Sequence, residues 1–240
     1  MKKNILILVL FIFVLSLGSG YLYAQEKPRL GVLRFTNNVG GIGWWSHRVA
    51  GELQDMLSSE LVSTREFQVL ERNEINAVLS EQDLSASGRV SKATLVKMKK
   101  IKGAKYLIAG TVTAYEQSGS KGGKVRFKGL SLGGKKTKTY IAVDVKIINT
   151  ETGEIVDART IEASAKGKAI GAGLSIRNFS IAGGQAKKTP TGKAIRACII
   201  YISEYLTCSL VQGLDAPCMD KWDQMDNRRR EKTKKSISLD

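Results

Sequence analysis

The chain has 240 residues, of which 42% are hydrophobic and 25% charged, a composition typical of a globular protein rather than a disordered or fibrous one. The chain has one histidine and three cysteines, too few for a typical metal site, cofactor site or histidine-based catalytic centre. We therefore expect no metal, no cofactor and no enzyme activity. The formal net charge of +16 indicates partners of opposite charge.

Residues 1–24 have the pattern of a signal peptide. Lys2 and Lys3 precede an unbroken apolar run at residues 5–15, and Ala24 ends a plausible cleavage site. The alternative is an uncleaved membrane anchor, although the run is short for crossing a bilayer. No cysteine follows the run, so a lipid anchor of the bacterial lipoprotein kind is not expected. For an exported basic chain, anionic lipid or an acidic client is a better partner than nucleic acid.

Residues 25–218 are predicted to form one α/β domain. Strands are expected where apolar residues alternate or cluster: 29–35, 66–70, 104–115, 139–148 and 154–163. Helices are expected where apolar residues recur at helical spacing: after Ser46, at 75–79, after Ser91 and after Thr189–Pro190. This order of elements predicts an α/β sandwich with a mixed sheet.

The C-terminal part of the chain carries two further predictions. Residues 219–240 are basic and contain few apolar residues, so we expect a disordered tail. A straight helix would separate Cys198 from Cys208 by about 15 Å, which is too far for a disulfide. Cys208 and Cys218 are therefore the candidate disulfide in an oxidising compartment, and Cys198 is expected to be a small buried residue.

Two basic insertions, 117–138 and 163–188, flank the central strand pair. They contain seven and five basic residues, respectively, and no acidic residue between Gln117 and Lys138 or between Ala163 and Lys188. Alternation puts one set of apolar residues on a common strand face, the candidate membrane-facing set: Val125, Phe127, Ile170, Ala172, Leu174 and Ile176. Such alternation over about ten residues suits a transmembrane β-strand.

The alternative for both insertions is a pair of flexible surface loops, because the segments are rich in glycine and their apolar faces are thin. The membrane interpretation has a structural consequence. Two hairpins cannot close a barrel, and open sheet edges are not tolerated in lipid. Many copies would therefore have to pool their hairpins in a homo-oligomeric ring.

Five segments in order carry a resemblance to a known family: Leu30–Thr36, Phe67–Arg72 (FQVLER), Ile101–Val112 (IKGAKYLIAGTV), Val145–Ile155 (VKIINTETGEI) and the helix start at Thr189–Pro190. Over residues 28–206 the chain resembles the CsgG family, the curli-type secretion channels of bacterial outer membranes. The resemblance implies an α/β domain in the periplasm with two membrane hairpins at the positions of the two insertions.

The resemblance also implies a function and a site. It implies an outer-membrane ring that passes unfolded polypeptide passively, with accessory envelope proteins as further partners. In family channels, the loop between the first strand and the first helix forms the pore constriction, and the matching candidates here are Asn37, Asn38, Trp44 and Trp45. The alternative for Trp44 and Trp45 is packing at the helix start or at a subunit contact. The alternative function is a soluble periplasmic module that binds envelope proteins.

Overall fold

A mixed β-sheet is the centre of the fold in this computed structural model, which describes residues 26–96, 100–120, 125–127, 130–132, 135–169 and 189–237. Its strands are β1 (Arg29–Val32), β2 (Thr36–Asn37), β3 (Gln68–Leu70), β4 (Tyr106–Ser120), β7 (Lys135–Asn149) and β8 (Ile155–Ala169). The order is β3-β1-β4-β7-β8, and β2 pairs with β4. Strand β1 is parallel to β3 and β4, whereas β4, β7 and β8 are antiparallel, so the predicted mixed α/β fold is confirmed.

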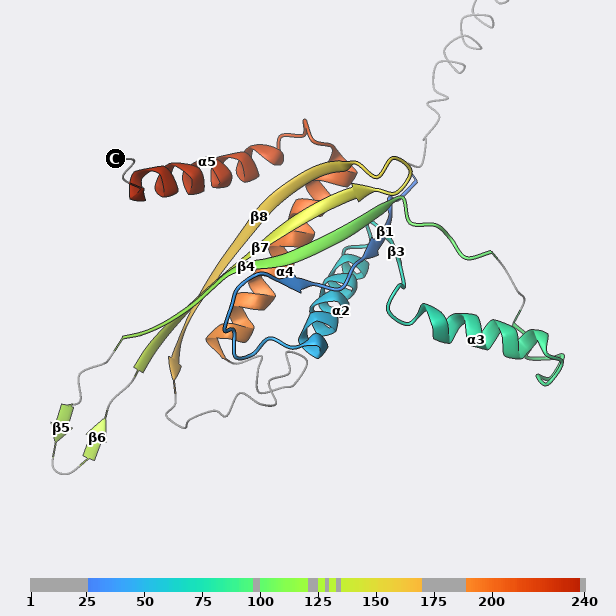
Figure 1. The fold of residues 1–240 in the computed structure, drawn as a ribbon, viewed down its shortest axis with the longest axis horizontal. Helices are drawn as coiled ribbons and strands as arrows, with labels where there is room; N and C mark the ends of the chain where they lie inside the picture. The colour runs from blue at the N-terminus through green and yellow to red at the C-terminus, as the bar shows by residue number, and fades with distance from the viewer. Residues whose placement is uncertain are drawn as a thin grey trace, which may run out of the picture.

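Helices α2 (His47–Thr64) and α4 (Pro190–Thr207) cover the same face of this sheet (Figure 1). Both begin as the sequence predicts. The Ser46 hydroxyl accepts a hydrogen bond from the Val49 amide at 3.2 Å, and the Thr189 hydroxyl accepts one from the Gly192 amide at 3.0 Å. These caps satisfy amides that have no partner within the helix.

The core lies between the two helices and the sheet. The alternating residues of β7 that the sequence assigns to one face are all buried: Ile141, Val143, Val145 and Ile147. The predicted buried face of α4 is buried as well: Ala194, Ile195, Cys198, Ile199 and Ile202. Lys146, on the opposite face of β7, is exposed. Period-2 and period-3.6 patterns therefore gave the correct buried faces.

One predicted helix is corrected. Residues 92–94 form a turn in which the Thr94 amide donates to the Ser91 carbonyl, so no helix begins at Ser91. Leu95 and Val96 are exposed there, and an apolar stripe stabilises a helix only where it packs. The helix before this turn, α3, spans Ile75–Ala86. Residues 117–120, 135–138 and 163–169 of the two insertions are paired strand residues that continue the sheet, as the hairpin interpretation predicts for these positions.

The C-terminal segment is helical rather than disordered. Helix α5 spans Met219–Ser236, and Met219 and Trp222 are buried in its first turn. The Trp222 ring packs edge-on against Tyr205 of α4, with centroids 5.8 Å apart. Asp220 in the first turn and basic residues in the last turn complement the helix dipole. Composition alone did not predict this helix. Two large side chains, Met219 and Trp222, are buried against the rest of the fold and are enough to hold it there.

A polar cluster around the buried Tyr205 joins α5 to β8 and α4. The hydroxyl of Tyr205, which is fully buried, donates to Asp157 Oδ2 at 2.6 Å. Arg159 Nη1 lies 2.9 Å from Asp223 Oδ1 and 3.5 Å from Asp226 Oδ2, and its guanidinium sits over the Tyr205 ring. Burial, followed by the hydrogen bond to Asp157, raises the pKa of Tyr205 above its ordinary value.

This cluster predicts a loss of stability in alkali. The folded state holds the Tyr205 proton more tightly than the unfolded state. The stabilisation that protonated Tyr205 gives the folded chain is therefore complete below about pH 10 and is lost as pH rises above that. We expect Tyr205→Phe to cost roughly 1–3 kcal/mol at pH 7, since Asp157 loses a donor, and to flatten the decline above pH 10. Urea unfolding from pH 7 to 11 measures both. Burial and Glu162 also raise the pKa of Tyr140, so some decline of stability above pH 10 should remain in the variant. A decline as steep in the variant as in the wild type would contradict the role assigned to Tyr205.

Candidate functional site

The predicted constriction loop lies at the end of the sheet where the long strands project. Thr36 and Asn37 of β2 pair in parallel with Thr111 and Val112 of β4, so β2 directs the loop toward the Ser120 end of β4. Figure 1 shows the loop, the start of α4 and the projecting ends of β4, β7 and β8 at this same end of the molecule. The loop and the strand extension are therefore neighbours in the fold.

Trp44 is part of the core. Its side chain is 5% exposed, and its ring packs edge-on against Tyr115 of β4 with centroids 5.3 Å apart. The Tyr115 hydroxyl in turn forms a 3.0 Å hydrogen bond with the Thr191 hydroxyl in the first turn of α4. Trp44 thus joins the loop to the sheet and to α4, as in the packing alternative, and it has little surface to offer to a passing chain.

The other loop candidates are more accessible. The Asn37 side chain is occupied locally, since its amide donates to the Val39 carbonyl at 3.0 Å and its carbonyl accepts from the Val39 amide at 2.9 Å. Asn38 is exposed, while its backbone amide bonds the Val112 carbonyl at 3.0 Å. Trp45 is half-buried and stacks edge-on against Trp44. Of the four predicted constriction residues, Asn38 is exposed and Trp45 is half-buried, so these two have the side chains most free of local contacts.

The strand extension is a continuous ladder. Strands β4, β7 and β8 have 15 residues each, about 50 Å, against the five or six usual in globular proteins. The β4–β7 ladder continues to Ser120↔Lys136, and the β7–β8 ladder to Lys135↔Ala169. Within the described residues, β2 pairs with β4 only up to Val112, and no strand pairs with the outer edge of β8.

The two faces of this extension differ in chemistry. On one face, register pairs Lys138 with Lys166, and both side chains are exposed. On the other face, Thr137 and Thr139 are buried, and a Cβ added to Gly167 would approach Pro190 at 2.8 Å. Gly167 is thus the close-approach point between β8 and the start of α4. Like charges directly opposite each other repel, so the lysine face favours water or an anionic partner.

The candidate membrane-facing residues are only partly within the described chain. Strands β5 (Val125–Phe127) and β6 (Leu130–Leu132) form a separate antiparallel pair. Register matches Val125 with Leu132 and Phe127 with Leu130, so apolar positions face apolar positions across this pair. The other candidates, Ile170, Ala172, Leu174 and Ile176, lie outside the described residues, as does the predicted signal peptide.

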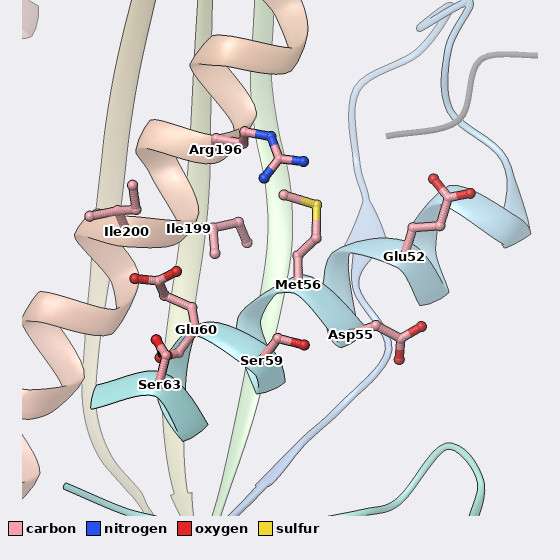
Figure 2. Close-up of a pocket in the computed structure, with 9 residues that line it drawn as sticks. All are labelled: Glu52, Asp55, Met56, Ser59, Glu60, Ser63, Arg196, Ile199 and Ile200. Atoms are coloured by element: carbon pink, nitrogen blue, oxygen red, sulfur yellow. Dashed lines mark hydrogen bonds between the residues drawn. The ribbon is translucent and has the colours of Figure 1, made fainter. Parts of the chain in front are cut away.

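An acidic groove between α2 and α4 was not predicted from the sequence. It has a volume of about 480 Å³, and Figure 2 shows Glu52, Asp55 and Glu60 of α2 lining it with Met56, opposite Arg196 and Ile200 of α4. A second hollow of about 540 Å³ shares Glu60 and Ile200 with the first and adds Glu66 and Glu204. Four of these acids lie in or just after α2, and the packing of α2 on α4 adds Glu204 and the wall opposite them.

The cysteines follow the predicted arrangement. A disulfide joins Cys208 to Cys218 with a Cα–Cα distance of 6.0 Å, and Cys198 is a free, buried thiol. Cys208 begins a short π-helix (η3, Cys208–Gln212) that continues α4, and Cys218 directly precedes α5. The disulfide therefore closes the connection between the two helices.

Two further searches of the described residues gave limited results. They contain no group of three or more His, Cys, Asp or Glu side chains arranged to hold a metal ion. One helical stretch, Pro190–Gln212, is long and apolar enough for a membrane span, but much of it is buried as the core helix α4. The packing of α4 against β7 and β8 explains its apolar composition.

The family model described as "Curli production assembly/transport component CsgG" matches residues 14–237. No curated protein matches the chain significantly.

Several solved structures have a similar arrangement of elements. A hypothetical protein from Chlamydia trachomatis has a TM-score of 0.43 and 11% identity, over 76% of this chain and 99% of that one. The PelC dodecamer from Paraburkholderia phytofirmans has a TM-score of 0.33 and 9% identity, over 73% and 84%. A lipoprotein from Neisseria meningitidis has a TM-score of 0.30 and 14% identity, over 61% and 88%. These similarities are too low to bear on function.

Proposed function

This chain belongs to the CsgG family, and from that premise we propose that its copies assemble into an outer-membrane ring that passes unfolded polypeptide out of the periplasm. Family membership makes the chain an envelope-associated module of the CsgG type. The proposal adds three things: the ring, the pore and the client. The client is an extended chain that moves passively, and accessory envelope proteins are expected to deliver it.

The observation that carries the proposal is the open-edged strand extension. From Thr113 onward, the outer edge of β4 has no strand partner among the described residues, and neither has β8. Unpaired backbone groups on long edges favour pairing with another chain. In lipid such pairing is obligatory, because every N–H and C=O group needs a partner. Strand β4 of one copy beside β8 of the next satisfies both edges at once.

A second observation supports assembly. Helix α3 carries exposed apolar side chains, with Val78, Leu79 and Leu84 each more than 40% exposed, and only Ser85 in this helix is buried. Figure 1 shows α3 standing away from the sheet. A helix with its apolar residues in water has little to stabilise it. Contact with a neighbouring copy would cover these residues.

The pore would be lined at two levels. Exposed Asn38 and Trp45 lie on the loop at the projecting end of the sheet, where they can form a ring of amide and aromatic groups in an assembly. Amide and aromatic side chains contact an unfolded chain without requiring one sequence. The lysines of the extension, Lys138 and Lys166, would then line water rather than lipid, and they favour an acidic client.

The alternative function is a periplasmic module that binds envelope proteins without forming a pore. One observation favours it. Where side chains of the extension are described, one face carries lysines, and the other carries threonine, glycine and alanine. Neither face has the apolar band that lipid requires. A membrane extraction experiment separates the two functions.

The test compares the full chain with a variant in which residues 121–135 are replaced by a two-residue Asn-Gly turn. This deletion removes β5 and β6 and leaves the ladder from Tyr106 to Ser120 intact. We expect the full chain to stay in the pellet after carbonate washing of outer membranes, to form rings in detergent and to conduct ions in planar bilayers. The variant should fold but leave the membrane.

The matched control is the double variant Glu151→Lys and Glu154→Lys in the turn between β7 and β8, at the far end of the strands. It alters charge without touching the extension, so it should remain membrane-bound. Release of the full chain into the supernatant, with protease cutting at residues 117–138 and 163–188, would support the binding module and contradict the pore.

A further inference from the structure

We propose that the basic second half of α5 from one copy docks in the acidic groove between α2 and α4 of the next copy, and that this contact joins the subunits head to tail. The inference rests on the proposed ring and specifies which surfaces meet. The donor surface is the basic stripe, defined as Arg228, Lys232 and Lys235. The acceptor surface spans the acidic groove and the adjoining second hollow, and its acids are Asp55, Glu60 and Glu66.

The basic stripe is exposed and directed to one side of α5. Arg228, Lys232 and Lys235 recur at i, i+4 and i+7, so they lie along one helix face. No ion pair joins any of the three to another described residue. Neighbouring cations on α5 are already paired, since Arg229 bonds Asp226 at 2.9 Å and Lys234 lies 3.7 Å from Glu231.

The acidic groove has charges to match. Glu60 lines both hollows between α2 and α4, and Glu66 lines the second. Within the described part of the chain, no ion pair involves either side chain. Asp55 accepts only a long 3.4 Å hydrogen bond from the Asn73 amide. Arg196 lines the first hollow and Lys221 the second, but three acids line each, so a cationic helix is a favourable occupant.

The groove already accepts one cation from α5 of its own chain. Lys221, in the first turn of α5, lies 3.0 Å from Glu204 and 4.8 Å from the centre of the Trp222 ring. All three residues line the second hollow. Basic residues of this helix are therefore compatible with the acids of the second hollow.

The basic stripe cannot reach the groove of its own chain. Asp223 and Asp226 pair with Arg159 of β8, and Arg229 lies 3.9 Å from Glu162 of β8, so α5 runs along this edge strand. Strand β8 is at one end of the sheet order, whereas α2 contacts β1 and β3 at the other. Figure 1 shows α5 leading away from α2. The occupant must come from another copy.

This arrangement has the symmetry that a ring needs. The donor helix and the acceptor groove are different surfaces of the same chain, so the contact is heterologous and generates a ring when the rotation closes. Apolar groups add to the charge match. Met225 precedes Arg228 by three residues on the same face of α5 and is exposed, and Met56 and Ile200 line the groove between the acids. Their contact would give the interface an apolar centre that excludes water, with the ion pairs around it.

The test is a charge swap. The stripe reversal is Arg228→Glu, Lys232→Glu and Lys235→Glu, the groove reversal is Glu60→Lys and Glu66→Lys, and the control is Lys146→Glu on the exposed face of β7. Each one-sided reversal should raise the concentration at which half the chains assemble by at least about tenfold. The combined variant should restore assembly to within about threefold of the wild type, because the charges are exchanged rather than lost. Mass photometry in detergent measures the assembly.

Crosslinking tests the contact directly. Chains carrying Lys232→Cys are mixed with chains carrying Glu60→Cys and oxidised. The native cysteines do not interfere, since Cys208 and Cys218 are bonded and Cys198 is buried. We expect mixed dimers that form only when both variants are present. Lys146→Cys in place of Lys232→Cys should give none.

The outcomes separate this inference from the proposed ring. A wild-type chain that assembles while neither reversal weakens it, and that gives no mixed dimer, overturns the helix-in-groove contact and leaves the ring standing. A wild-type chain that never assembles contradicts both. A stripe reversal that leaves assembly intact but abolishes binding to vesicles of anionic phospholipid assigns α5 to the membrane surface and overturns the contact.

Discussion

Replacement of Trp44 by alanine should destabilise the protein by about 3–5 kcal/mol, the largest effect expected for a single substitution in the loop between β2 and α2. Trp44 is 5% exposed and contacts both Trp45 and Tyr115, so its removal leaves a cavity between the loop, β4 and α4. Urea unfolding followed by circular dichroism measures the change. The corresponding fall in Tm is roughly 10 °C.

Trp45→Ala is the matched control, because Trp45 is the adjacent residue and is only half-buried. It should cost less than about 1.5 kcal/mol. If the loop lines a pore, Trp45→Ala and Asn38→Ala should instead raise the single-channel conductance by widening the constriction. Equal destabilisation by Trp44→Ala and Trp45→Ala would contradict the division of the loop into a core residue and an outward-facing one.

Loss of the Cys208–Cys218 disulfide should cost about 2–3 kcal/mol, as expected for a loop of this length. The two cysteines are 10 residues apart, and Cys218 holds the start of α5 where Met219 and Trp222 are buried. Reduction with dithiothreitol before urea unfolding measures the change without any substitution. Hydrogen exchange should show the greatest loss of protection in α5, because the disulfide shortens the backbone connection between α4 and α5 and holds the start of α5 beside α4.

Cys198→Ala controls for effects of reductant elsewhere. Burial raises the pKa of the Cys198 thiol to about 12, so this thiol stays protonated and does not exchange with the disulfide near neutral pH. The variant should therefore lose stability on reduction by the same amount as the wild type. A wild-type chain whose unfolding midpoint is unaffected by reductant would contradict a stabilising role of the disulfide.

Local patterns were sufficient for the sheet and for most of the helices. Alternation in β7 identified its buried face, the Ser46 and Thr189–Pro190 signals identified two helix starts, and cysteine spacing identified the disulfide. Each of these signals depends on residues only a few positions apart. Backbone geometry links such residues in the same way in any protein, so the sequence is informative at this range.

Long-range packing decided the rest. Composition favoured disorder for residues 219–240. However, Trp222 packs against Tyr205 and Arg159 forms an ion pair with Asp223, and these contacts hold α5 in place. The sequence left Trp44 either to a pore constriction or to packing at the helix start or a subunit contact, and in the folded chain its ring is buried against Tyr115.

The sequence by itself determined the order of the elements, their buried faces and the family of the chain. Only the tertiary structure revealed the full length of the β4–β7–β8 ladder, its two open edges and the acidic groove opposite in charge to α5. The physical reason is distance along the chain. A ladder edge or a groove is formed by residues tens of positions apart, so its charge and exposure exist only after the helices have packed on the sheet.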